Sequence, residues 1–472
     1  TSAGYREVPV IAQRRFVEFG PRGSPFDSTQ YQAQVGVRGK LSSSLNYDVS
    51  AQYGETAQDQ FRTNYGSFSA LQQALRSYRT GAGDAVCSDT SGGCVPFNLF
   101  GPLGSITPAM LNFIDLDPKV SRKTTLAVAT ASVSGDLFGL SSPLSTSPIA
   151  FSIGAEYRRL TAESMPDAPS QIAGEVLGTG TRQAADRGRI ETKEVFGELI
   201  VPLITQRPFF HSLQAEGGVR YSDYNTTGGS LTWKAGGTYE PVRGVKLRGM
   251  YQRAVRSPNI LELFQSPVPQ LGNLATDPCQ GTLPLNNAPL TALCVATGAP
   301  ASAIGSIPTP SSSQINQTTS GNPNLDVERA STLTIGGVIA PAALRGFSLT
   351  VDYYHIKVKD AITVPAPGDI LNGCYSAALN PSLSYNAFCQ LIGRNPLNGS
   401  LNGAADTPGV ILGGSNFGTI ETSGIDVSAS YRSSLERFLG SNAGAIRIGF
   451  TGTWLRYYHF QATPNSINRD CT

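Results

Sequence analysis

The sequence has few of the residues and motifs from which enzyme active sites are built. Only 3 histidines, 3 methionines and 2 tryptophans occur in 472 residues. The chain has no G-x-S-x-G, no H-E-x-x-H and no P-loop. We therefore expect neither an enzyme nor a cofactor. An outer-membrane hydrolase stays open as an alternative, because the Ser, His and Asp of a catalytic triad can come from separate strands.

Long apolar runs and an excess of one charge are also missing. No run approaches the roughly 18 apolar residues that a membrane helix needs. Lys plus Arg total 36 and Asp plus Glu total 34, so the net charge is only +2 and no basic patch predicts nucleic-acid binding. The opening TSAGYREVPV lacks the charged start and apolar core of a signal peptide. We expect the sequence to be a fragment that begins inside the mature protein.

What the chain does have is alternation. The 51 glycines and 31 prolines fit a fold with many turns. About thirteen segments carry apolar residues on one parity and polar residues on the other, as Val245, Leu247 and Tyr251 do against Lys246 and Arg248. Because side chains point to alternate faces of a strand, this pattern predicts strands with one apolar face. We expect these apolar side chains to face lipid: Leu213, Val219, Leu231, Ile335, Leu349, Val427 and Ile448.

The opposite parity carries charges of both signs. Such a face cannot pack as a dry core, because unpaired buried charge is costly. We expect it to face water or another polar surface, and its charged members include Arg38, Glu156, Arg158, Glu216, Arg220, Lys234, Lys246, Arg248 and Asp426.

The connections between these segments alternate between short and long, with one exception at residues 225–229. Short turns at one end and long loops at the other are typical of outer-membrane barrels. Outward-pointing Tyr and Trp side chains also fall near both ends of the strands, as expected for two aromatic belts. A soluble β-sandwich is the alternative, because its strands alternate as well, although it predicts no such order of loops.

The seven cysteines avoid the expected strands and short turns. Their spacing groups Cys87 with Cys94, Cys279 with Cys294, and Cys374 with Cys389, each pair within one long loop. A zinc site is the alternative to three disulfides, but no C-x-x-C occurs and the histidines lie far away in the sequence. We expect Cys471 to pair with a cysteine beyond Thr472. The loops themselves, as in the polar stretch 259–321, are expected to be poor in core contacts.

Two blocks in the middle of the chain resemble motifs of one family. The first resembles the R-S-P-N-x-x-E-L-F motif of TonB-dependent receptors and consists of Arg256, Ser257, Pro258, Asn259, Glu262, Leu263 and Phe264. The second resembles that family's N-P-x-L-x-x-E-x-S, which opens the next strand, and consists of Asn322, Pro323, Leu325, Glu328 and Ser331. The segments RRFVEFGPR at 14–22 and CVPFNLFG at 94–101 are similar to parts of the same family.

This resemblance implies an all-β fold, a transmembrane antiparallel β-barrel with long extracellular loops. Residues 1–472 would supply about 13 strands of a plugged barrel of roughly 22. The plug domain, the signal peptide and the C-terminal strands would be absent.

The function implied is import of a scarce nutrient, such as a ferric siderophore, cobalamin or an oligosaccharide, across the cell outer membrane. The implied partners are outer-membrane lipid, the receptor's own plug, TonB of the inner-membrane complex and the small-molecule ligand. A passive porin or adhesin-like barrel is the alternative. Parity places Arg256 toward the lumen near the outer rim and Arg253 toward the outer leaflet.

Overall fold

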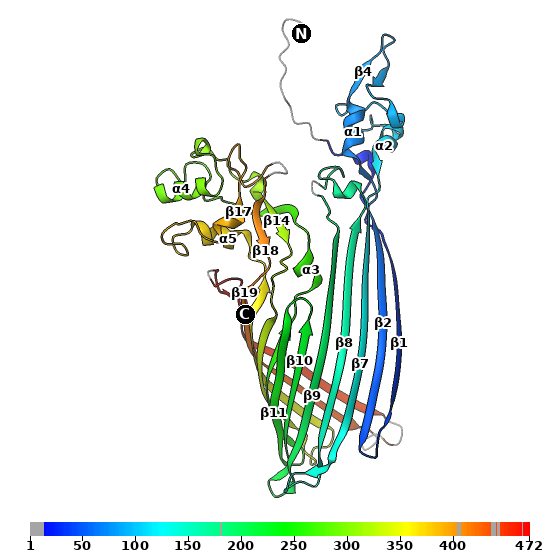
Figure 1. Cartoon of the computed structure of the whole chain (residues 1–472), viewed down its shortest axis with the longest axis vertical. Coiled ribbons are helices and arrows are strands. Elements are labelled where there is room, and N and C mark those ends of the chain that lie inside the picture. Colours follow the sequence, from blue (N-terminus) through cyan, green and yellow to red (C-terminus); the bar gives the residue numbers. More distant parts are fainter. Residues whose placement is uncertain (1–13, 180–181, 404–406, 436–439, 441–443, 465) are drawn as a thin grey trace. The chain divides into compact units, whose positions relative to one another are not determined.

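The computed structural model describes residues 14–179, 182–403, 407–435, 440, 444–464 and 466–472. The chain forms two compact units (Figure 1). Of the described residues, the first contains 14–30, 56–123, 163–179 and 182–186, and the second contains those within 31–55, 124–162 and 187–472. No helix in the described residues is long and apolar enough to cross a membrane.

A 13-stranded sheet dominates the fold (Figure 1). Its strands follow one another in chain order, and from β9 onward every pair with a described register is antiparallel. The strands are β1 (Phe26–Lys40), β2 (Leu45–Phe61), β7 (Lys119–Ser141), β8 (Pro148–Pro166), β9 (Asp186–Arg207), β10 (Phe210–Tyr224), β11 (Gly228–Val242), β12 (Val245–Arg256), β15 (Glu328–Ile339), β16 (Phe347–Thr363), β19 (Ser415–Ser434), β20 (Ala445–Gln461) and β21 (Arg469–Asp470). The prediction of an all-β fold with about thirteen strands is confirmed. The sheet is open, with β1 and β21 at its edges, so the total of about 22 strands stays a prediction.

The register of the sheet separates an apolar face from a polar face. Directly opposed residues on neighbouring strands share a face. Val219 opposes Trp233, and Ile335 opposes Tyr353. On the other face, Arg220 opposes Thr232. The alternation read from the sequence therefore holds in three dimensions.

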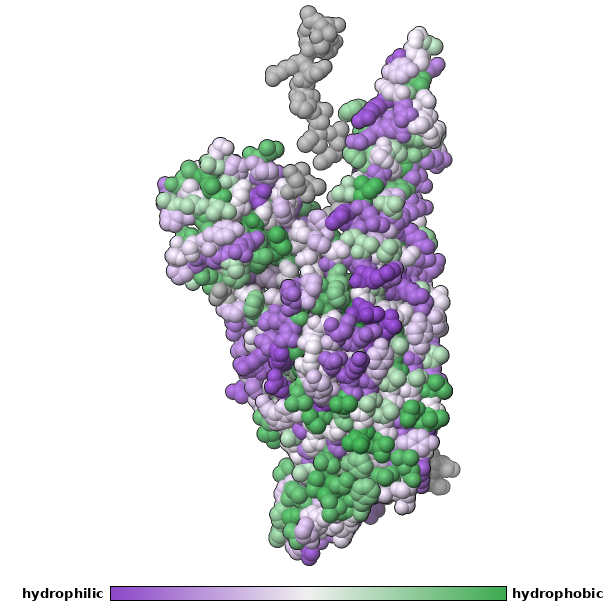
Figure 2. All heavy atoms as spheres, viewed as in Figure 1, coloured by the Kyte–Doolittle hydropathy of each residue, from purple (hydrophilic) through white to green (hydrophobic). Residues whose placement is uncertain are grey.

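The side chains expected to face lipid occupy the apolar face. Val219, Leu231, Ile335 and Ile448 are exposed, whereas Leu213, Leu349 and Val427 are half-buried by neighbouring strands. Figure 2 shows hydrophobic residues gathered over the part of β9, β10 and β11 nearest the short turns.

The connections follow the expected order. Residues 41–44, 142–147, 208–209, 243–244 and 340–346 form the short turns, while the short connection predicted near Leu439 falls outside the described residues. Residues 62–118, 167–185, 257–327 and 364–414 form long connections, and 225–227 is the predicted short exception. Gly244 is required where two short turns meet, since its φ is +86° and a Cβ there would lie 2.3 Å from the carbonyl oxygen of Ala340 in the 340–346 turn.

The first unit has a small core of its own. Its elements are β3 (Tyr65–Gly66), α1 (Phe68–Leu75), β4 (Ser77–Arg79), β5 (Ala85–Cys87), α2 (Pro108–Ile114) and β6 (Asp115–Leu116). Ser67 caps α1 by accepting a hydrogen bond from the Ala70 amide, and Thr107 caps α2 in the same way. The buried side chains of this core are Leu71, Ala74, Phe97, Ile106 and Ile114.

Candidate functional site

Arg256, the last residue of β12, joins three elements at the ends of the strands. Its guanidinium donates to Glu328, at the start of β15, over 2.7 Å from both Nε and Nη2. It also donates to Glu262 of α3 (Ile260–Phe264) over 2.9 and 3.0 Å. The two motif blocks, separated by a long connection, therefore meet at one side chain. We call this group the rim clamp.

Helix α3 is positioned by its own cap and by a small apolar cluster. Asn259 and Glu262 form a capping box, in which each side chain accepts a hydrogen bond from the other residue's amide. Leu263 is only 1% exposed and packs with Ile190, Ile260 and Leu325. Pro258 is fully buried and ends β12, as expected of a residue that cannot donate to the ladder.

The remaining motif residues extend this arrangement. Asn322 donates from its amide to the Glu262 carbonyl and from its side chain to the Gly414 carbonyl. Phe264 packs against the same apolar cluster. Ser331 lies in β15 between Arg253 and Lys357 of the neighbouring strands, on the face of Trp233. Ser257 and Pro323 lie in the turns that leave β12 and approach β15.

Two long connections, residues 257–327 and 364–414, fold against each other into what we call the cap. Its elements are β13 (Val268–Asn273), α4 (Ala288–Ala296), β14 (Gln314–Ser320), α5 (Pro367–Tyr375), β17 (Ile392–Gly393) and β18 (Gly409–Gly413). The strands form a second sheet in the order β13-β14-β18-β17. Within it, β14 from the first connection pairs in parallel with β18 from the second.

The expectation that these loops are poor in core contacts is wrong. The cap encloses the largest buried cluster among the described residues, with Ile307, Ile315, Ile370 and Val410 each at most 1% exposed. The prediction failed because each connection supplies only part of this core. Neither segment shows the regular spacing by which a strand or helix face is recognised.

The three predicted disulfides are confirmed. Cys279–Cys294 and Cys374–Cys389 lie in the cap, while Cys87–Cys94 lies in the first unit. Six thiols are thereby committed to sulfur–sulfur bonds, which removes the zinc alternative for these cysteines. Cys471 is exposed and unpaired in the described residues.

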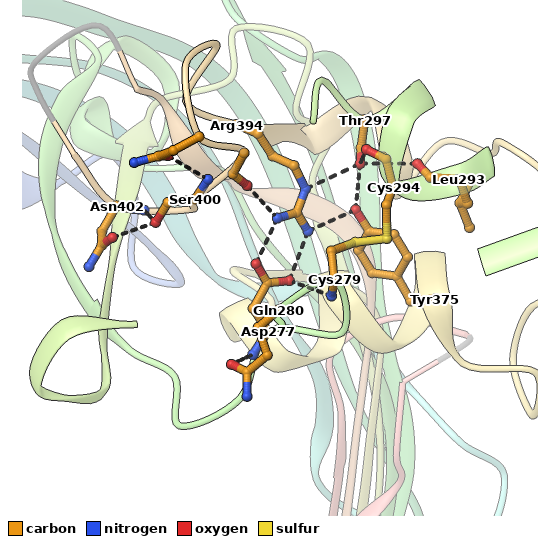
Figure 3. A network of polar contacts seen from close by, with 12 residues as sticks. Asp277, Cys279, Gln280, Leu293, Cys294, Thr297, Tyr375, Arg394, Ser400 and Asn402 are labelled. Atoms are coloured by element: carbon orange, nitrogen blue, oxygen red, sulfur yellow. Dashed lines mark hydrogen bonds and ion pairs between the residues drawn. A yellow bond between two sulfur atoms is a disulfide. The ribbon is translucent and has the colours of Figure 1, made fainter. Parts of the chain in front are cut away.

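A buried ion pair lies at the centre of the cap (Figure 3). The side chains of Arg394 and Asp277 are 0% and 1% exposed and meet through two parallel hydrogen bonds of 2.6 and 2.8 Å. Arg394 also donates to the Gly399 carbonyl, to Thr297 Oγ1 and to the Tyr375 hydroxyl, over 2.9, 3.3 and 3.1 Å. All five guanidinium N–H donors thus have acceptors, as a buried arginine requires.

The partners of Arg394 come from both connections. Asp277, beside Cys279, and Thr297, at the end of α4, belong to the first, while Tyr375, beside Cys374, belongs to the second. Burial lowers the pKa of Arg394, but the hydrogen bonds and charge interactions with Asp277 and Tyr375 together outweigh burial and raise the pKa. Burial also raises the pKa of Tyr375, although the charge of Arg394 opposes this. The guanidinium therefore stays charged and the phenol stays neutral at physiological pH.

The polar face of the main sheet is crossed by ion pairs. Arg220 donates to Glu194 and lies 3.6 Å from Glu156, and Arg248 pairs with Asp352. Further pairs join Lys234 to Glu198 and Arg158 to Glu156, and Asp426 accepts a hydrogen bond from Thr453. Alternation along their strands places Arg38, Glu216 and Lys246 on the same face. Much of this charged face is therefore internally paired.

Comparison with known proteins identifies the family. The family model for the TonB dependent receptor-like beta-barrel matches residues 4–470, and the chain belongs to this family. No curated protein matches the chain.

Similar solved structures include the siderophore receptor PirA from Acinetobacter baumannii, with 13% identity and a TM-score of 0.46. That match covers 93% of this chain and 49% of PirA, so the chain spans about half of PirA's length. The FrpB iron transporter from Neisseria meningitidis shares 12% identity over 94% of this chain and 45% of its own, with a TM-score of 0.45. The RagAB peptide transporter shares 10% identity over 93% of this chain and 38% of its own, with a TM-score of 0.44.

Proposed function

We propose that the chain is part of the barrel of an outer-membrane receptor that imports a scarce nutrient with energy from the TonB complex. Family membership and the two-faced sheet support this proposal. The apolar face would contact outer-membrane lipid. The charged face would line a lumen filled by the receptor's own plug, through which TonB would act.

The observation that carries the receptor role is the folded cap. A passive pore needs only an open path, whereas a receptor gains affinity when its binding surface is ordered before the ligand arrives. Two disulfides, a parallel strand pair and a fully bonded buried arginine order the cap. The rim clamp then fixes the first connection of the cap to β12 and β15. We infer that the cap selects the ligand.

The polar composition of the cap suits hydrogen bonding to many kinds of ligand, so composition alone does not identify the ligand. Ferric siderophores, cobalamin and oligosaccharides are the candidate classes. We propose no catalytic activity.

Uptake in matched cells tests the proposal. The whole receptor is expressed in cells with and without TonB, and uptake of labelled ferric siderophores, cobalamin and oligosaccharides is measured. We expect at least one of them to accumulate only when both receptor and TonB are present. Accumulation that persists without TonB would instead support the passive porin.

A further inference from the structure

The first unit contains a cavity of about 830 Å³. It lies between residues 14–22, the start of the 62–118 connection and residues 177–178. Its size falls within the range of small-molecule sites. It is formed within the first unit alone, so it belongs neither to the cap nor to the rim clamp.

Part of this cavity is apolar and firmly supported. Phe16 and Phe19 line it, and both also pack against the buried core of the unit. Phe16 meets Phe97 edge to face, with ring centroids 5.6 Å apart. Leu177 adds an aliphatic surface. A flat or aliphatic ligand body would therefore rest on side chains that are already held in place.

The polar part of the lining is cationic. Arg14, Arg15 and Arg22 line the cavity, and no Asp or Glu does so among its described lining residues. Arg14 is already committed, since it donates to Glu18 and to the carbonyls of Leu99, Gly101 and Pro102. Arg15 is exposed, and its guanidinium makes no hydrogen bond or ion pair within the described residues.

Arg22 is held in position while most of its donors stay available. Its guanidinium lies 4.6 Å from the centre of the Tyr65 ring, and its Nη2 donates to the Leu177 carbonyl over 3.2 Å. That bond is the single hydrogen bond of its side chain in the described structure. Gly178 has φ of +81°, and a Cβ there would lie 2.2 Å from Nη2 of Arg22, so a side chain at 178 would displace the guanidinium.

We propose that this cavity binds an organic oxyanion, a carboxylate or phosphate on an aromatic or aliphatic body. The oxyanion accepts hydrogen bonds from Arg15 and Arg22, whose planar donor groups match such anions. The body packs on Phe16, Phe19 and Leu177. The proposal does not depend on transport, because it concerns binding to the first unit alone.

Calorimetry on the whole protein in lipid nanodiscs tests this site. Phenyl phosphate and benzoate are the probes. The two reference compounds are phenol, which lacks the negative charge, and inorganic phosphate, which lacks the apolar body. We expect phenyl phosphate or benzoate to bind, and both reference compounds to bind at least tenfold more weakly. Arg22→Gln should weaken binding about ten- to a hundredfold, because charge-assisted hydrogen bonds are lost. Arg22→Lys should retain part of the affinity.

Arg76→Gln is the matched control, since Arg76 is exposed in the same unit outside the cavity. An intact Cys87–Cys94 bond and an unchanged circular dichroism spectrum establish that each variant is folded. The proposal is overturned if neither probe binds at millimolar concentration, if phenol binds as well as phenyl phosphate, or if Arg76→Gln weakens binding as much as Arg22→Gln.

Discussion

Removal of Arg394 should open the cap while the main sheet stays folded. In the variant Arg394→Met the Asp277 carboxylate stays buried without its cation, because both side chains are at most 1% exposed. Breaking one side of such a pair costs about 3–5 kcal/mol. Each 1.4 kcal/mol changes an equilibrium constant tenfold. The equilibrium constant for opening of the cap should therefore rise by a factor of roughly one hundred to a few thousand.

Hydrogen exchange measured by mass spectrometry resolves this effect locally, because each cap peptide reports its own opening equilibrium. Peptides from α4, α5 and β18 should exchange faster in the variant, whereas peptides from β10 and β11 should not change. Arg345→Met is the control, since Arg345 is exposed in the 340–346 turn.

The double variant Asp277→Leu/Arg394→Met separates loss of the pair from loss of contacts. Replacing both charges with apolar groups is often neutral or stabilising, so the double variant should be more protected than the single one. The reasoning is refuted if the single variant exchanges like the wild type, or if the double variant exchanges as fast as the single one.

Three further predictions concern the sheet, the rim and the disulfides. Ile335→Arg, in the middle of β15, should destabilise the protein in membranes by about 2–4 kcal/mol, the cost of an arginine near mid-membrane; an unchanged urea midpoint in vesicles would contradict a lipid-facing position. Arg256→Gln should reduce ligand uptake and loosen the cap, whereas Arg253→Gln should alter membrane insertion, and identical behaviour of the two variants would count against their opposite parities. Replacing Cys279 and Cys294 with serine should cost the cap about 3 kcal/mol, as the chain-entropy model gives for a loop of about 15 residues; equal hydrogen exchange before and after would show that the bond adds nothing.

The sequence was sufficient to predict the sheet because its signal is local. Apolar and polar residues alternate within each strand, and the register confirms the two faces. Strand ends were less clear. β2 continues from Tyr53 to Phe61, but this extension is polar on both parities, so alternation gave no sign of it.

The cap was not predictable in the same way because its contacts are distant in sequence. Arg394 and Asp277 are 117 residues apart, and nothing in the residues around either one indicates the other. The disulfides were predicted because cysteines are rare and each pair lies within one connection. The rim clamp was only partly foreseen: the resemblance identified Arg256, Glu262 and Glu328, while the structure showed that one guanidinium joins them.

The most direct test of the central claim measures what each face of the sheet contacts. Nitroxide labels are placed one at a time from residue 213 to residue 221 and from 231 to 239, in Cys471→Ser protein reconstituted in vesicles. Collision rates with oxygen, which concentrates in lipid, and with a water-soluble nickel chelate are then compared. The account predicts high oxygen access at Leu213, Val219 and Leu231, with lower oxygen access at Glu216, Arg220 and Lys234. Equal access to the water-soluble reagent on both faces, or no access to either reagent on the apolar face, would contradict a barrel wall in a membrane.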